Sequence, residues 1–196
     1  MKRSLDFIIA LASIILFSPI LLLISFLILI SDGMPIFFSQ SRVGKDGQIF
    51  RLIKFRSMRV LKGSENGSFD AGNTSRITGI GRILRKTKLD ELPQLFNVLL
   101  GNMSIVGPRP EVEQWTKAYP ERWKKVLKVK PGITDNASIE FRNEEELLAA
   151  ATDPEQCYRN EILPRKLDLY EAYVDNRSVF KDLSIVLRTV FVVVFK

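Results

Sequence analysis

An uncharged apolar segment near the N-terminus constrains this chain more than any other feature. Residues 7–31 read FIIALASIILFSPILLLISFLILIS and contain no charged side chain. A helix rises about 1.5 Å per residue, so a segment of this length matches a bilayer hydrocarbon core of about 30 Å. It is too long for the core of a signal peptide, and no small-residue cleavage site follows it. We therefore expect a membrane anchor that stays in the mature protein.

The dipeptide Ser18-Pro19, in the middle of this segment, leaves two topologies open. Proline lacks a backbone N–H donor, so a kink or break is expected there, and the Ser18 hydroxyl can bond a freed carbonyl. A kinked helix could span the membrane, which the length favours. A broken helix would enter and leave on one face, which the positive-inside tendency favours because cations flank both ends. These cations are Lys2, Arg3, Arg42, Lys45, Arg51, Lys54 and Arg56.

Composition limits the chemistry that the rest of the chain can perform. A chain of 196 residues suffices for one domain with a real core. The formal net charge of +7 suggests an anionic partner: phosphate groups, nucleic acid or acidic lipid. A single cysteine, Cys157, excludes an intrachain disulfide. The absence of histidine removes Ser/His and Cys/His nucleophile pairs, so catalysis must use carboxylates, lysine, arginine, hydroxyls or a bound metal.

The segments after the anchor predict an α/β fold, mostly helical with a short β-hairpin. Residues 35–55 read as two strands around a turn at 44–47, and residues 62–74 are small and polar, as in a loop. The apolar end, 183–195, is too short to span a bilayer, so we expect it to dock onto the core or the membrane surface. Helices are expected at 79–88, 89–100, 111–130 with an interruption at Pro120, 144–151 and from 153 onward, and a turn at 130–134.

The helix expected at 111–130 spaces three aromatic residues four apart, with lysines nearby. Trp115, Tyr119 and Trp123 suit a membrane interface, where aromatic rings lie at headgroup depth and lysines meet anionic lipid. An ordinary amphipathic helix packed on the protein core explains the same pattern. Both interpretations stay open at this point.

The adjacent acids Asp90 and Glu91 follow a basic stretch and also allow two interpretations. Thr87 lies three residues before Asp90, as in a capping box, and acids are favoured near a helix start. Alternatively, one carboxylate attacks an electrophile while its neighbour binds a divalent cation, since adjacent helical side chains diverge. Without histidine, carboxylate attack on phosphorus is one of few covalent routes, and Mg²⁺ would neutralise the phosphates.

Prolines on both sides of Arg109 fix the backbone around one guanidinium. That group suits phosphate oxygens, although a rigid surface turn with a solvated arginine explains the pattern equally well. Lys54 and Arg56, in KFRSM, either face the same phosphates or lie at a strand edge. No single motif is specific, but their combination with a membrane anchor is.

Together these motifs resemble the bacterial sugar transferase family, the monotopic phosphoglycosyl transferases that start glycoconjugate assembly on polyprenol phosphate. The resemblance extends over most of the chain, and the central segment around the acidic pair is highly specific. It rests on Ser18-Pro19, FFSQSRVGKDGQIFRLIKFRSM (37–58), LDELPQLFNVLLGNMSIVGPRPE (89–111) and KPGIT (130–134).

The resemblance implies transfer of a sugar 1-phosphate from a UDP-sugar to polyprenol (undecaprenyl) phosphate, with release of UMP. Asp90 would be the nucleophile, giving a phosphosugar-aspartyl intermediate, and Glu91 together with Asp90 would hold Mg²⁺. The residues expected to contact substrate are Lys54, Arg56, Arg85, Pro108, Arg109 and Pro110.

The resemblance also reverses the topology that length favours, because the Ser-Pro break of this family gives a re-entrant helix. Residues 1–33 would form a re-entrant anchor in membrane lipid. Residues 34–196 would form one small catalytic domain on the cytoplasmic face of the bacterial inner membrane.

After Thr134 the chain departs from the short members of the family, with DNASIEFRNEEELLAAATDPEQCYRNEILPRKL in place of a compact segment. We expect Asp135 and Arg142 to reshape the sugar or nucleotide pocket. Neither the sugar nor the oligomeric state follows from these residues.

Three other functions are compatible with parts of the sequence. A membrane-anchored scaffold without enzymatic activity would tolerate replacement of Asp90 and Glu91. A lipid-linked phosphatase would use the same nucleophile and pass the phosphoryl group to water. Nucleic-acid binding is disfavoured, because the cations form no stripe and no known binding motif is present.

Overall fold

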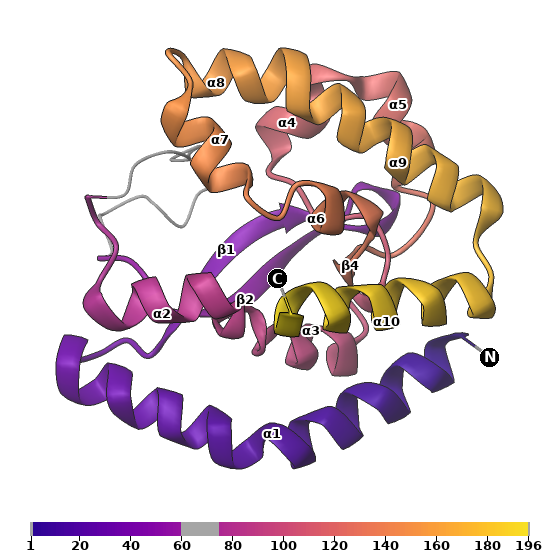
Figure 1. Cartoon of the computed structure of the whole chain (residues 1–196). Helices are drawn as coiled ribbons and strands as arrows, with labels where there is room; N and C mark the ends of the chain where they lie inside the picture. Colours follow the sequence, from indigo (N-terminus) through magenta and orange to yellow (C-terminus); the bar gives the residue numbers. More distant parts are fainter. Residues whose placement is uncertain (1, 60–74, 196) are drawn as a thin grey trace.

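The computed structural model describes residues 2–59 and 75–195 (Figure 1). It is mostly helical, with one antiparallel hairpin, one short parallel strand pair and a long apolar helix at the N-terminus. The loop expected at 62–74 lies outside the described residues.

Helix α1 (Lys2–Asp32) continues through Pro19 and bends near its middle. Pro19 has no N–H to donate to the carbonyl of Ile15, and the Ser18 hydroxyl donates to that oxygen instead, at 2.8 Å. The structure therefore has a kink rather than a break. Among the described residues, α1 is the one helix long and apolar enough to cross a membrane.

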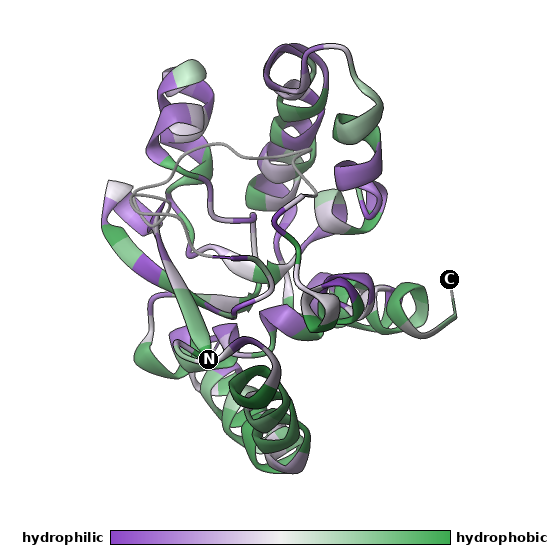
Figure 2. Cartoon of the chain, turned by 90° about the vertical axis from the view of Figure 1, so that its left-hand side faces the viewer, coloured by the Kyte–Doolittle hydropathy of each residue, from purple (hydrophilic) through white to green (hydrophobic). Residues whose placement is uncertain are grey.

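One face of α1 packs against the rest of the chain, and the remainder is exposed and apolar (Figure 2). Near its N-terminus, Asp6 is 5% exposed and accepts hydrogen bonds from Ser104 Oγ at 2.9 Å and Ile105 N at 3.1 Å. Near its C-terminus, Ile24 and Ile28 are buried beside Phe55. Both ends of α1 thus contact the same body of protein.

The predicted hairpin is confirmed. Strand β1 (Phe37–Val43) pairs antiparallel with β2 (Ile49–Phe55), and a 3₁₀ turn at Lys45–Gly47 connects them. Asp46 at φ 55° and Gly47 at φ 77° supply the left-handed conformations of this turn. The side chain of Asn97 joins the hairpin to the next helical layer, because it accepts from Ile53 N and donates to Arg51 O.

The helix expected at 79–88 is confirmed as α2 (Gly79–Thr87), capped by the Thr78 hydroxyl. The next segment, expected as one helix, is divided into a 3₁₀ turn, η3 (Leu89–Glu91), and α3 (Gln94–Leu100). The capping-box interpretation is wrong: Thr87 donates to carbonyls within α2, and Lys88 has a left-handed conformation at φ 59°.

The segment at 130–134, expected to be a turn, contains a short strand in its second half. Strand β4 (Gly132–Thr134) pairs parallel with β3 (Ser104–Val106). The backbones of these two segments approach so closely that a Cβ on Gly132 would lie 2.1 Å from the backbone nitrogen of Gly107. Only glycine fits this position, and the approach fixes the start of the loop at 107–110.

The C-terminal half is a layer of helices. The predicted interruption at Pro120 and the helices starting near 144 and 153 are confirmed. These helices are α4 (Glu113–Ala118), α5 (Pro120–Val126), α6 (Asn136–Glu140), α7 (Glu144–Ala150), α8 (Pro154–Cys157), the π-helical turn η4 (Tyr158–Ile162), α9 (Leu163–Asn176) and α10 (Val179–Phe195).

The membrane-interface interpretation of the aromatic residues in α4 and α5 is wrong. Trp115 and Trp123 are 3% and 2% exposed. Their rings pack on Tyr158 and Tyr170 at 4.8 and 6.0 Å between centroids. The alternative, an amphipathic helix pair on the core, is confirmed, because the helical layer is thick enough to bury both indoles.

The apolar C-terminal end docks on the protein core, as one of the two expected alternatives states. In the view of Figure 1, α10 lies above the first half of α1. Ile185 is buried next to Val106 and Tyr173, and Lys2 forms an ion pair with Asp182 at 2.5 Å.

Replacing Asp6 tests the docking of α1. In Asp6→Leu the Ser104 hydroxyl and the Ile105 N–H lose their acceptor, so we expect the free energy of unfolding to fall by about 1 to 3 kcal/mol. Asp6→Asn keeps an acceptor and is the matched control, with a smaller loss. Thermal unfolding in one detergent measures both; equal midpoints for wild type and Asp6→Leu would contradict this role.

Candidate active site

The 3₁₀ turn η3 directs the two acids of the pair toward different cavities. Asp90 is 6% exposed and lines a polar cavity of about 270 Å³. Glu91 lines an adjacent, mainly apolar cavity of about 570 Å³. The left-handed Lys88 turns the chain from α2 into η3 and so orients both side chains. The two carboxylates therefore have different environments although they are adjacent in sequence.

Glu91 is held between two cations. Its Oε1 accepts from Lys54 Nζ at 2.8 Å and from Arg109 Nη2 at 2.5 Å, and its Oε2 accepts from Arg109 Nη1 at 3.1 Å. Burial alone would raise the pKa of Glu91, but Arg109 and Lys54 lower it well below its ordinary value. Burial also lowers the pKa of Lys54 although Glu91 opposes this shift. Glu91 is consequently an ionised, fully engaged carboxylate.

Asp90 has the opposite character. Within the part of the chain that the structure describes, its Oδ1 is buried and has no hydrogen-bond partner. Burial, and after it the charge on Glu91, raise its pKa to about 6, even though nearby Lys54 opposes the shift. A buried carboxylate oxygen without a partner is costly, and such groups are typical of functional sites.

The loop at 107–110 presents Arg109 to the pair. Gly107 N donates to Thr134 O at 3.1 Å, and Gly132 N donates to Pro108 O at 3.0 Å. Pro108 and Pro110 are buried and line neither cavity, so they position Arg109 rather than contact a ligand there. The fork of Arg109 is thereby directed at Glu91.

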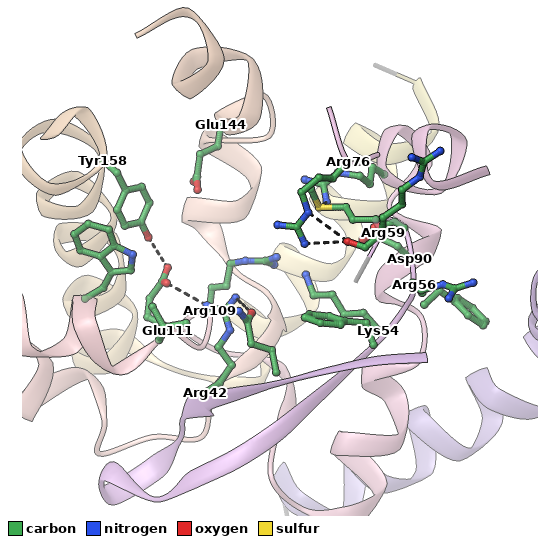
Figure 3. A pocket seen from close by; sticks show the side chains of 18 of the residues that line it. Arg42, Lys54, Arg56, Arg59, Arg76, Asp90, Arg109, Glu111, Glu144 and Tyr158 are labelled. Atoms are coloured by element: carbon green, nitrogen blue, oxygen red, sulfur yellow. Dashed lines mark hydrogen bonds and ion pairs between the residues drawn. The ribbon is translucent and has the colours of Figure 1, made fainter. Parts of the chain in front are cut away.

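Most cations predicted for substrate contact line the polar cavity (Figure 3). Lys54 and Arg109 converge on its centre. Arg85 also lines the cavity and is paired with Glu145 at 2.6 Å. Arg56 also lines the cavity, although its guanidinium donates to Met34 O and Gly33 O at the end of α1. The positive side chains around the cavity are Arg42, Lys54, Arg56, Arg59, Arg76, Arg85, Arg109 and Lys166.

Two predicted substrate residues lie elsewhere. Asp135 is 2% exposed and caps α6 by accepting from Ala137 N, Ser138 N and Ser138 Oγ. Arg142 lines the apolar cavity and donates to the carbonyl of Val192 in α10. The structure therefore does not bring these two side chains to the polar cavity that Asp90 lines.

A polar network that was not predicted from the sequence lies at the other end of the cavity (Figure 3). Glu111 accepts from the Tyr158 hydroxyl at 2.5 Å and pairs with Arg42 at 3.4 Å. Lys166, 3% exposed, pairs with Glu144 at 2.5 Å. Glu111 could have been noticed in the sequence, because it directly follows the Pro-Arg-Pro motif. Tyr158 and Lys166 arrive from distant helices, and no local pattern indicates them.

The expected Mg²⁺ can be tested against these carboxylates. Mg²⁺ is commonly held by one or two carboxylates together with substrate phosphates and waters. Both oxygens of Glu91 are engaged by cations, whereas Asp90 Oδ1 has no partner in the described ranges 2–59 and 75–195, so Asp90 offers the available ligand. No group of three or more acidic, cysteine or histidine side chains suited to a metal occurs among the described residues. The site fits a metal held partly by its substrate.

Comparison with known proteins gives consistent matches. The model of the family described as bacterial sugar transferase matches residues 1–196. The exopolysaccharide production protein ExoY of Rhizobium meliloti is 36% identical, over 96% of this chain and 83% of that protein. The UDP-glucose:undecaprenyl-phosphate glucose-1-phosphate transferase of Escherichia coli is 36% identical over 97% of this chain, but over only 39% of its own length.

A third relative is named for a different sugar. The UDP-N-acetylgalactosamine-undecaprenyl-phosphate N-acetylgalactosaminephosphotransferase of Aeromonas hydrophila is 36% identical, over 96% of this chain and 42% of that protein. The chain thus spans most of ExoY and less than half of the two longer relatives.

The environment of Asp90 predicts a pH-dependent stability difference. The pKa of Asp90 is about 6 in the folded protein and 3.8 in an unperturbed aspartate. Ionised Asp90 therefore destabilises the fold most fully above pH 6, and this penalty disappears as the pH falls toward 4. At pH 7 we expect Asp90→Asn to unfold with a free energy about 1 to 3 kcal/mol higher than wild type. Thermal unfolding in detergent with chelator measures this.

The exposed Asp175, in α9, provides the control. Asp175→Asn makes the same chemical change where the carboxylate is paired with Lys125 in solvent, and should not stabilise the protein. A difference between wild type and Asp90→Asn that does not shrink between pH 7 and pH 5 would contradict the environment described for Asp90.

Proposed function

Because the chain belongs to the bacterial sugar transferase family, we propose that it transfers a sugar 1-phosphate from a UDP-sugar to undecaprenyl phosphate. Two relatives are named for this reaction, with different sugars. The observation that carries the proposal is the buried, unpaired Asp90 oxygen at the wall of a cavity lined by cations. A scaffold protein would have no reason to retain such a group, so the scaffold alternative is not favoured.

In the first step a carboxylate oxygen of Asp90 attacks the phosphorus that carries the sugar. The pyrophosphate bond breaks, its electron pair leaves with UMP, and a phosphosugar-aspartyl intermediate remains. Arg42, Lys54 and Arg109 lie around the cavity to bind the diphosphate oxygens. Bound Mg²⁺, with Asp90 and the substrate phosphates as its candidate ligands in place of the engaged Glu91, would lower the repulsion between the carboxylate and the phosphates.

In the second step an oxygen of the lipid phosphate attacks the same phosphorus. The bond from phosphorus to Asp90 breaks, and its electron pair restores the carboxylate, so no proton transfer to the protein is needed. Burial supports this order of events, because it limits access of water that would hydrolyse the intermediate. The Glu111, Glu144 and Tyr158 end of the cavity supplies polar partners suited to sugar hydroxyls.

For topology, we propose that α1 is re-entrant and that the catalytic site lies on the cytoplasmic face. The kink at Pro19 and the cations at both flanks support this. A further support is that both ends of α1 contact the same body of protein, through Asp6 at one end and Ile28 at the other. A helix that crossed to the far side of the bilayer would lose one of these two sets of contacts.

The reaction is tested by UMP release from a panel of UDP-sugars with undecaprenyl phosphate and Mg²⁺. Wild type should release UMP with one sugar donor in a lipid-dependent manner. Asp90→Asn should lose at least about a thousandfold in rate and all covalent labelling, since an amide is a very poor nucleophile. Asp175→Asn is the control and should react like wild type. Near-normal turnover in Asp90→Asn would eliminate Asp90 as the nucleophile.

Cysteine accessibility tests the topology. In a Cys157→Ser background, single cysteines replace the exposed Ser4, before the apolar segment, and Asp46, at the hairpin turn. A membrane-impermeant maleimide should label both in inverted inner-membrane vesicles and neither in intact spheroplasts. Labelling of the two positions from opposite sides would show a spanning helix and refute re-entry.

A further inference from the structure

The apolar cavity beside the acidic pair has no role in the reaction as described so far. It lies between α1, η3 with the start of α3, α6 and α10. Its volume is about 570 Å³, roughly twice that of the polar cavity. Apolar side chains from these elements form its walls, among them Phe17, Leu92, Leu95, Ile139, Val190 and Val193. Such a cavity suits a hydrocarbon ligand rather than a nucleotide.

One end of this cavity is charged and meets the polar cavity. Arg109, Glu144 and Lys166 line both cavities, Asp90 lines only the polar one, and Glu91 lines only the apolar one. The acidic pair and Arg109 therefore separate two compartments of opposite polarity. A ligand with an anionic head and an apolar tail would match this arrangement, with its head at Arg109.

The outer surfaces next to the cavity are apolar as well. Helix α1 exposes most of its apolar side chains, and in Figure 2 both α1 and α10 are green along much of their length. Along α10 the exposed large side chains recur at helical spacing, at Phe180, Leu183, Leu187, Phe191 and Phe195. The two helices that flank the cavity thus both present lipid-compatible faces, which gives a bilayer-embedded ligand a continuous path.

Polar contacts hold the last turns of α10 over the cavity. Thr189 and Thr134 share a hydrogen bond at 2.6 Å, Arg188 donates to Asn136 at 3.3 Å, and Arg142 donates to the Val192 carbonyl. Two of these partners precede or begin α6, and the third follows it. The wall made by α10 is therefore fixed to the end of β4, to the start of α6 and to the turn after α6.

We propose that this cavity receives the first prenyl units of the acceptor lipid, with α10 as its outer wall. The proposal rests on the function proposed above and adds where its acceptor binds. The lipid phosphate passes Arg109, where the two cavities meet, and takes the place that UMP leaves. Its oxygen then bonds to the phosphorus as the bond to Asp90 breaks. Donor and acceptor tail consequently occupy separate compartments and share only the phosphate position.

Filling the cavity from α10 tests this assignment. Val190 lines the cavity but is 54% exposed, so Val190→Trp can fill the mouth of the cavity without overpacking the core. Leu187→Trp, on the same helix at a 62% exposed position outside the cavity, is the matched control. Two rates are measured: lipid-dependent transfer, and exchange of labelled UMP into UDP-sugar without lipid, which needs only the first step.

We expect Val190→Trp to raise the KM for undecaprenyl phosphate at least about tenfold with unchanged UMP exchange, and Leu187→Trp to change neither. An unchanged KM in Val190→Trp, or an equal loss of both rates, would overturn the assignment. Absence of both rates in wild type would instead reject the proposed reaction itself, so the two failures are distinguishable.

A second measurement does not depend on turnover. Undecaprenyl phosphate with a photoreactive group on its first prenyl units should label peptides that contain Phe17 and 189–193 in wild type, and Val190→Trp should reduce this labelling severalfold. Labelling confined to the outer face of α10, around Leu183 and Leu187, would mean that the lipid only lies against the protein and would overturn the assignment.

Discussion

The ion pairs of Glu91 with Lys54 and Arg109 are the interaction on which the rest of the site depends. They join three segments far apart in sequence: strand β2, the turn η3 and the loop at 107–110. Each partner is partly or fully withdrawn from water, so removing one would leave the others as uncompensated charges. Because the same contacts fix the side chain of Arg109, they also determine where the two cavities meet.

The two adjacent carboxylates show how environment divides roles between similar groups. Glu91 receives both cations, and its pKa falls despite burial. Asp90 receives no hydrogen bond at Oδ1 from the residues that the structure describes, and its pKa rises to about 6. Titratable neighbours whose pKa values move apart are a general mark of divided function. Here the engaged carboxylate positions cations, and the unpaired one is left available for attack.

Local patterns predicted what local interactions decide. The hairpin, α2, the bend at Pro19 with its serine hydrogen bond, and the acidic pair itself all follow from a few adjacent residues. The burial of Trp115 does not, because an amphipathic pattern is the same whether the apolar face meets lipid or a second helical layer. The pairing of β3 with β4 joins segments that are about thirty residues apart in the sequence, so no local pattern specifies it. Tyr158 likewise reaches the site only through tertiary packing. The capping-box interpretation failed because the left-handed Lys88 separates Thr87 from the turn that it would cap.

The docking of α1 bears on how a soluble sugar donor and a lipid acceptor could react in turn at the same phosphorus atom. A catalytic group that acts on a carrier phosphate must stay at a fixed depth relative to the bilayer, and a helix tethered at only one end would not fix it. Contacts at both ends of α1, at Asp6 and at Ile28, make the anchor and the site one body. The polar cavity then opens among hydrophilic elements and the apolar one beside α1 itself. In the proposed reaction, separation by polarity would let each substrate arrive from its own phase, and the covalent link to Asp90 would carry the phosphosugar between the two encounters.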